Sequence, residues 1–363
     1  MAVKARCLVG LDVHARQTHA TVLDRDSGQL SACKLRGLPE EAVLPFLERF
    51  GPDVLAVYEA GPTGFGLARE ARRRGLDVRV IAPGSIPRAP GDRVKTDPRD
   101  SLRLLRLLAA GELSFVFVPS VEDERFRDLM RGIDDLRGDL MRARHRLSKF
   151  LLRAGHRYEQ GQAWTARHMA WLRALHFDDA CAQATLADYL SAVEFGLARR
   201  QALIEALDRS LPDCSHAHTI ARLRCFRGIE TLSAAGLCAE LHGFRPFPRP
   251  AQVSGFVGIV PSERTSDTKR RQGSITKAGS GHARRLLVEA AHHYRHRPAI
   301  GQTLARRQAR QDPRVIEIAW RAQRRLHQRW QRLHFERRKP SGVVAVAVAR
   351  ELAAFLWEAA TLA

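Results

Sequence analysis

Long apolar runs are missing from this sequence. No stretch approaches the roughly 20 consecutive apolar residues that a membrane-spanning helix needs, although 45% of the 363 residues are hydrophobic. Acidic residues are also scarce relative to basic ones, because 39 Asp and Glu stand against 60 Lys and Arg, for a formal net charge of +21. We therefore expect no membrane partner and a cytoplasmic, nucleoid-associated protein of two or three domains that binds a polyanion, with nucleic acid as the best match.

Cysteine pairs typical of zinc sites or of a disulfide framework are missing as well. The six cysteines are scattered and none forms a CxxC pair, so we expect reduced thiols. The fifteen histidines show no ligand spacing such as HExxH, which gives a histidine metal site little support. Carboxylates and hydroxyls are the better candidates for the chemistry of this chain.

The first 115 residues alternate short apolar segments with turns. They predict three strands, a helix, a strand, a helix, a strand and a helix, at residues 6–12, 18–23, 30–35, 39–50, 54–58, 61–75, 78–81 and 98–110. This order is that of the ribonuclease H-like fold. We therefore predict an α/β domain with a mixed sheet over residues 1–115.

A heptad pattern follows at residues 121–154. Its apolar residues alternate in steps of three and four, which is typical of a coiled coil, at Phe126, Leu129, Ile133, Leu136, Leu140, Ala143, Leu147 and Phe150. Residues 184–211 also have a helical pattern, so the two segments can pair as an antiparallel arm or between subunits. A plain bundle helix also explains the first segment, but the regular repeat favours a subunit seam. We predict a helical coiled-coil arm at 116–215 and a mainly helical domain at 216–363.

Four acids fall where a metal site in such a fold needs them. Asp12 and Glu59 each follow an apolar strand, while Asp97 and Asp100 lie three residues apart on one face of a predicted helix. The first and fourth strands are neighbours in a ribonuclease H-like sheet, so we predict that the four carboxylates converge. Such hard oxygen ligands suit Mg²⁺, with Mn²⁺ as an alternative, and a pair of these ions supports phosphoryl transfer.

Each of these acids also has a local structural explanation. Asp97 could be the N-cap of the helix, with Pro98 at its first position, and Asp100 could interact with the helix dipole. Asp12 alone could be a turn residue at the end of a strand. Two apolar strands that each end in an acid, together with the DxxD pair, favour the metal site.

A second candidate site lies at residues 261–279, which mix hydroxyls, cations and glycines. A serine can attack a phosphodiester where the site stabilises the transition state, but spacing alone does not choose among Ser262, Ser266, Ser274 and Ser280. Cations that would offset phosphate charge are Lys269, Arg270, Arg271 and Lys277. Composition alone favours a basic surface loop that contacts a nucleic-acid backbone.

The motifs along the chain resemble those of one known family. Residues 10–14 (GLDVH), 58–64 (YEAGPTG) and 95–100 (KTDPRD), followed by 258–261 (GIVP) and 275–279 (ITKAG), occur in the order found in the DEDD transposases of insertion-sequence family 110. These enzymes are described as bridge-RNA-guided recombinases. The resemblance covers nearly the whole chain.

This resemblance implies an N-terminal domain similar to the RuvC resolvase, a coiled-coil arm and a C-terminal transposase domain. The family's metal-binding acids fall on Asp12, Glu59, Asp97 and Asp100. Its catalytic serine, five residues beyond the proline of the GIVP motif, falls on Ser266, with Ser262 as the alternative. The implied partners are donor and target DNA, a structured noncoding guide RNA, and further copies of the chain in a dimer or tetramer.

We therefore expect a transposase that exchanges DNA strands through a serine nucleophile assisted by Mg²⁺. One alternative is a metal-dependent, resolvase-like nuclease that uses water, which would survive Ser266→Ala but not Asp12→Ala. Another is a non-catalytic nucleic-acid-binding protein, which would keep its function in both variants.

Overall fold

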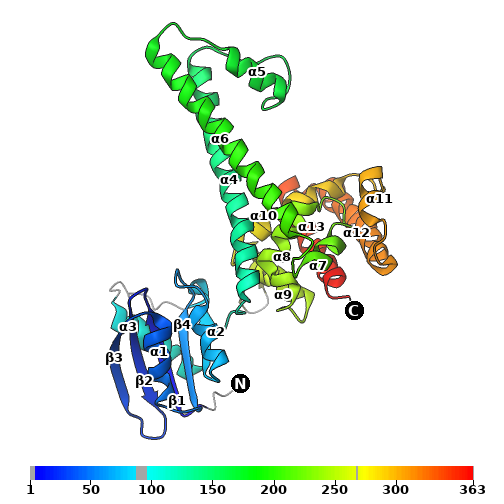
Figure 1. Cartoon of the computed structure of the whole chain (residues 1–363). Helices are drawn as coiled ribbons and strands as arrows, with labels where there is room; N and C mark the ends of the chain where they lie inside the picture. Colours follow the sequence, from blue (N-terminus) through cyan, green and yellow to red (C-terminus); the bar gives the residue numbers. More distant parts are fainter. Residues whose placement is uncertain (1–4, 87–95, 267–268, 363) are drawn as a thin grey trace. The chain divides into compact units, whose positions relative to one another are not determined.

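The computed structural model describes residues 5–86, 96–266 and 269–362, which belong to two compact units (Figure 1). The first unit ends at Ser120 and contains a five-stranded sheet, whereas the second begins at Val121 and is mainly helical. Within these described ranges, no helix is both long and apolar enough to cross a membrane.

The sheet of the first unit is mixed. Its strands are β1 (Cys7–Val13), β2 (Gln17–Asp24), β3 (Leu30–Arg36), β4 (Val54–Glu59) and β5 (Asp77–Ile81), in the order β3-β2-β1-β4-β5. Strands β1, β2 and β3 form an antiparallel meander, while β4 runs parallel to both β1 and β5. The predicted α/β class and strand order are confirmed, and the arrangement is consistent with a ribonuclease H-like fold.

Helices cover both faces of this sheet. Val9 and Leu11 of β1 belong to a core with residues of α1 (Pro39–Glu48) and α2 (Gly66–Arg73). Leu8 belongs to a second core with α3 (Asp97–Ala110). Successive residues of a strand point to opposite faces, so a strand buried on both faces needs a continuous apolar run, which β1 has.

The start of α3 contradicts the interpretation of Asp97 as the N-cap of this helix. Thr96 precedes the helix in an extended conformation, and Asp97 is its first residue. The Asp97 carboxylate has contacts with Gln17 and two histidines, so it does not act as a helix cap. Proline is tolerated anywhere in the first turn of a helix, where backbone N–H groups lack helical partners. Pro98 therefore did not fix the residue at which α3 begins.

Two long helices, α4 (Val121–Arg153) and α6 (Ala180–Ser210), form the arm of the second unit, with α5 (Ala166–Ala174) at its far end (Figure 1). Leu140 and Leu147 of α4 share a core with Leu186 of α6, while Ile133 shares another with Leu207. The two helices are therefore antiparallel. The apolar heptad residues of α4 pack against α6 of the same chain, which is the first of the two pairings considered. They are not exposed for contact with a second subunit.

The rest of the second unit is a helical body. Its helices are α7 (Ala217–Leu223), α8 (Thr231–Leu241), α9 (Pro250–Phe256), α10 (Gly281–Ala291), α11 (Gln302–Gln308), α12 (Pro313–Gln331) and α13 (Ser341–Ala360). Short helical turns lie at His242–Phe244, His292–Arg295 and Arg332–Glu336. The apolar face of α13 and almost the whole of α8 are buried in one core.

A β-hairpin forms in the serine-containing segment, where composition alone favoured a basic surface loop. Strands β6 (Pro261–Ser266) and β7 (Lys269–Ile275) pair in antiparallel fashion between α9 and α10. Neither strand has the alternation of apolar and polar residues that marks a half-buried strand. The pairing rests on backbone hydrogen bonds, which periodicity cannot reveal.

The buried His242, at the end of α8, makes the second unit sensitive to acid. Burial, and next the charge of Arg127, lower the pKa of His242 from 6.5 to about 4. Between these two pKa values, the unfolded chain therefore binds a proton at His242 that the folded chain does not bind. The free energy of unfolding consequently decreases as the pH falls. We expect the free energy of unfolding to decrease by about 2 kcal/mol from pH 7 to pH 5 through this group.

Urea unfolding of the full chain, followed by circular dichroism at both pH values, measures this decrease. His242→Asn is the informative variant, because asparagine tolerates the left-handed backbone (φ 52°) of this position. The variant should reduce the pH dependence. An unchanged pH dependence in His242→Asn would show that other groups cause it.

Candidate metal centre and serine hairpin

The candidate metal centre depends on how closely α3 approaches β1. A Cβ atom on Gly10 would lie 2.1 Å from the carbonyl oxygen of Ser101 and 2.7 Å from the backbone nitrogen of Leu105. Only glycine therefore allows this contact between helix and strand. A buried hydrogen bond of 2.8 Å between the hydroxyls of Thr21 and Ser101 adds a second link. Together they place the first turn of α3 beside the end of β1.

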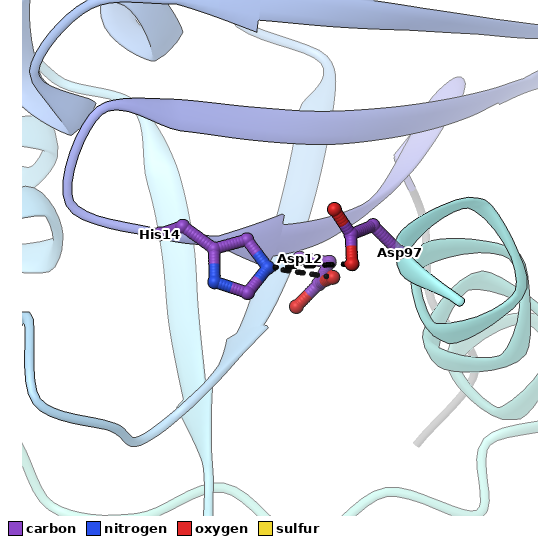
Figure 2. A group of neighbouring side chains, drawn as sticks. All are labelled: Asp12, His14 and Asp97. Carbon is purple, nitrogen blue, oxygen red and sulfur yellow. Dashed lines mark hydrogen bonds and ion pairs between the residues drawn. The ribbon is translucent and has the colours of Figure 1, made fainter. Parts of the chain in front are cut away.

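Asp12, His14 and Asp97 come together at this end of the sheet (Figure 2). The His14 Nε2 atom is 3.2 Å from Asp12 Oδ2 and 3.7 Å from Asp97 Oδ1. One ligand atom from each side chain lies within 4.8 Å of the others. On its other side, Asp97 Oδ2 accepts a hydrogen bond of 3.4 Å from Gln17 Nε2 and lies 3.5 Å from His19 Nε2.

The electrostatics of this cluster favour a bound cation. Burial raises the pKa of the Asp12 carboxyl, and the charges of Asp97 and Asp100 add to this shift, while His14 opposes it. Neighbouring carboxylates repel one another when ionised, and a divalent cation offsets this repulsion. Carboxylate oxygens suit Mg²⁺ and Mn²⁺, and an imidazole nitrogen beside them suits Mn²⁺ better than Mg²⁺.

Glu59 and Asp100 lie near this cluster without joining it in the described structure. Leu11 pairs with Tyr58 in the parallel ladder of β1 and β4, so Glu59 is next to Asp12 in the register, with an exposed side chain. Asp100 is half-buried in the first turn of α3 and is close enough to influence the pKa of Asp12. Convergence of all four acids stays a prediction.

His14 was not recognised as a candidate from the sequence. Its motif was used for the resemblance, but only Asp12 received a role. The signal was the spacing, because residues two apart along an extended segment point to the same side. His14 follows the last residue of β1, so its ring and the Asp12 carboxylate meet.

The base of the serine hairpin is held by two glycines with positive φ angles. A Cβ atom on Gly258 (φ 66°) would lie 2.4 Å from the backbone nitrogen of Ala278, and one on Gly279 (φ 64°) would lie 1.8 Å from the carbonyl oxygen of Phe256. The Thr276 N–H donates a hydrogen bond of 2.9 Å to the Val260 carbonyl. The GIVP and ITKAG motifs are therefore the two sides of one tightly packed base.

Two of the four candidate serines have structural contacts. The Ser262 hydroxyl donates a hydrogen bond of 2.9 Å to the Ser274 carbonyl across the hairpin. The Ser280 hydroxyl accepts one of 3.1 Å from the Ala283 N–H and caps α10. Ser266 is the last residue of β6 and pairs with Lys269 at the far end of the hairpin.

The side chains at the far end of this hairpin, residues 264–271, lie outside what the structure describes. This group includes Ser266, Lys269, Arg270 and Arg271, so only their backbone positions in β6 and β7 are known. Lys277 lies beyond β7 with an exposed side chain and a positive φ angle of 55°. Their predicted contacts with phosphate stay predictions.

The fold and the carboxylate cluster define a DNA-processing enzyme of the transposase class when they are compared with known proteins. A family model described as a DEDD transposase of the IS110 type matches residues 9–155, and one described as "Transposase IS116/IS110/IS902 family" matches residues 220–305. The first match spans the metal cluster and the whole of α4. The second spans the serine hairpin and its base.

Curated relatives agree with both matches. The chain is 41% identical over 301 residues to "Putative transposase y4qE" of Sinorhizobium fredii, covering 83% of this chain and 73% of the relative. It is 31% identical over 348 residues to "Transposase for insertion sequence element IS1533" of Leptospira borgpetersenii, covering 93% and 99% of the two chains. This chain belongs to the IS110 family of DEDD transposases.

The hairpin base gives a direct test of the glycine contacts. Gly279→Ala should lower the free energy of unfolding by at least about 1–2 kcal/mol, because the left-handed backbone alone costs an alanine that much and its Cβ would meet the Phe256 carbonyl. Gly255→Ala in the neighbouring α9 is the matched control, since a Cβ there meets nothing within 4 Å. Urea unfolding of both variants makes the comparison, and equal losses would contradict the role of Gly279.

Proposed function

We propose that this transposase exchanges DNA strands through the Ser266 hydroxyl, assisted by a divalent metal held by Asp12 and Asp97. The observation that supports this proposal best is the meeting of these two carboxylates, from β1 and from α3, in a chain of the DEDD family. In this proposal Glu59, next to Asp12 in the register of β1 and β4, and Asp100, in the first turn of α3, would complete the ligand set.

Several residues prepare these carboxylates for a metal. Gln17 donates a hydrogen bond to Asp97, and His19 lies beside the same oxygen, so the orientation of Asp97 is fixed from β2. His14 lies between the two acids and provides a nitrogen donor or a proton. When bound, Mg²⁺ or Mn²⁺ supplies positive charge that stabilises the attacking and leaving oxygens of phosphoryl transfer.

Ser266 is the best nucleophile that the hairpin offers. Ser262 and Ser280 are engaged in the hydrogen bonds described above, and Ser274 lies towards the base of the hairpin in β7. In the proposed step, the serine oxygen forms a bond to phosphorus as the bond to one sugar oxygen breaks, and the serine proton leaves with that sugar hydroxyl. The resulting phosphoserine retains an ester bond that a second DNA end can attack.

The basic residues of the hairpin would bind the reacting phosphate. Lys269, Arg270 and Arg271 begin β7, three to five residues after Ser266, and Lys277 follows the strand. Charged hydrogen bonds of Lys and Arg to phosphate are among the strongest that proteins make. Their placement close to Ser266 in the sequence supports transition-state binding by this segment.

The proposal includes partners that the family resemblance implies. A structured noncoding RNA would select donor and target DNA by base pairing, as in other RNA-guided systems, and the chain would act at the nucleoid as a dimer or tetramer. The formal net charge of +21 supports binding of more than one nucleic acid. Recombination with and without the RNA transcribed beside the element tests this part separately.

A second candidate is a nuclease that uses water in place of serine. The Asp12, His14 and Asp97 cluster supports it, because these residues need no serine to position a metal-bound water. Loss of the serine separates the two functions, whereas loss of the metal ligands abolishes both.

The test is recombination between a donor and a target plasmid, with denaturing gels that reveal DNA covalently attached to protein. Ser266→Ala should lose both recombination and the attached DNA, by at least about a thousandfold, because it removes the nucleophile. Asp12→Asn should lose both as well, whereas Ser274→Ala, a serine in the same hairpin, should retain them.

Two outcomes would contradict the serine mechanism. DNA cleavage that persists in Ser266→Ala without attached protein would identify water as the nucleophile. Attached DNA that disappears in Ser262→Ala but persists in Ser266→Ala would move the nucleophile to Ser262.

A further inference from the structure

The solvent-exposed side of α4 changes its charge midway along the helix. Exposed acids occupy its first half at Asp128, Asp135 and Asp139. From Leu140 to the end of the helix there is no acid, and the exposed cations are Arg142, Arg146, Lys149 and Arg153. We call these four cations the basic stripe.

The four cations of the basic stripe lie on one face of the helix. At 3.6 residues per turn, they fall within an arc of about 60° and span about 16 Å along the axis. The buried residues of the same segment, including Leu140, Leu147 and Leu151, lie on the opposite side, where α6 packs. The basic stripe therefore points away from α6 and its acids.

The basic stripe is largely uncompensated. Arg142 pairs with Asp139 one turn earlier. Within the described part of the chain, the side chains of Arg146, Lys149 and Arg153 have no ion pair or hydrogen bond. Exposed like charges at successive turns of a helix repel one another, so a polyanion laid along this face would relieve the repulsion.

The basic stripe continues the side of α4 that packs on the helical body. Arg131 donates a hydrogen bond of 2.8 Å to the buried Glu240 of α8, and Arg285 of α10 pairs with Asp134. Arg131 and Lys149 are about five helical turns apart, so they project in the same direction, about 27 Å apart along the axis. Ser280, which begins α10, directly follows the base of the serine hairpin.

We propose that the basic stripe binds the phosphate backbone of the DNA duplex that flanks the reacting phosphodiester. About five base pairs, at 3.4 Å each, cover the 16 Å of the basic stripe. The rise between successive cations, about 4.5–6 Å, lies between one and two of the 3.4 Å steps that separate phosphates along a strand. The arm would thereby hold the DNA in line with the hairpin. This inference extends the proposed function and rests on it for the identity of the bound DNA.

A second copy of the chain is the main competing occupant. An antiparallel copy of α4 would place its acidic half opposite the basic stripe. Exposed ion pairs contribute little to binding, and this face lacks the apolar centre that stable protein interfaces have. Charge matching alone would not offset the translational and rotational freedom that two chains lose on association. DNA, with its dense and regular charge, is the better fit.

The experiment is fluorescence anisotropy of the full chain with a labelled 24-base-pair DNA duplex between 50 and 300 mM salt, read by the dependence of log K on log salt. The stripe variant carries Gln at Arg142, Arg146, Lys149 and Arg153. Each lost phosphate contact reduces the slope by about 0.9. We therefore expect a slope about 3–4 smaller and at least about tenfold weaker binding near 100 mM salt.

The control variant removes the same charge from exposed cations of the arm outside the basic stripe, with Gln at Arg157, Arg167, Arg199 and Arg209. An equal loss in both variants would contradict the proposal, because the effect would then depend on net charge alone. A Ser266→Ala background separates binding from catalysis, so failure of the serine mechanism would leave this result unaffected.

Two further measurements identify the occupant. An RNA duplex of the same sequence is titrated in parallel, and a loss confined to RNA would overturn the assignment to DNA. Sedimentation without nucleic acid compares the wild type with the stripe variant. A change of oligomeric state with unchanged DNA affinity would show that a second copy occupies this face.

Discussion

The metal centre depends on the direct contact between the backbone of α3 and β1 at Gly10. A side chain at this position would collide with the Ser101 carbonyl and push the helix away from the sheet. The buried Thr21–Ser101 hydrogen bond sets the position of the helix along the strand. Because of these two contacts, the first turn of α3 places Asp97 beside Asp12. The meeting of the two carboxylates therefore depends on the absence of a side chain at Gly10.

The serine hairpin uses the same physical device in the second unit. Gly258 and Gly279 let two backbone segments approach so closely that neither position accepts a Cβ atom. A hairpin without an apolar face gains little from burial, so a rigid base is what fixes its position. Helix α4 combines two functions in a similar way, because its apolar side packs on α6 while its outer side carries separated charges. Both sites thus depend on backbone packing more than on their own side chains.

The order of the strands could be predicted because short turns join β1, β2 and β3 into a meander, while helices separate β3, β4 and β5 along the chain. The start of α3 could not, since Pro98 fits several positions in a first turn. His14 was overlooked because a single exposed histidine has no helical or CxxC-like spacing, and its place two residues after Asp12 on an extended segment was not used. The alternation of apolar and polar residues could not predict the hairpin, because the residues of its strands are polar on both sides. The resemblance to a family supplied Ser266, which spacing alone had not singled out.

Manganese binding tests the central claim most directly. Electron paramagnetic resonance follows Mn²⁺ titrated into the wild type, Asp12→Asn, Gly10→Ala and Gly84→Ala. A Cβ atom at position 10 collides with α3, whereas one at position 84 meets nothing within 4 Å. The account predicts that Gly10→Ala weakens Mn²⁺ binding as much as Asp12→Asn does, while Gly84→Ala binds like the wild type. If Gly10→Ala remains folded and binds Mn²⁺ with unchanged affinity, the contact between α3 and β1 does not create the metal site.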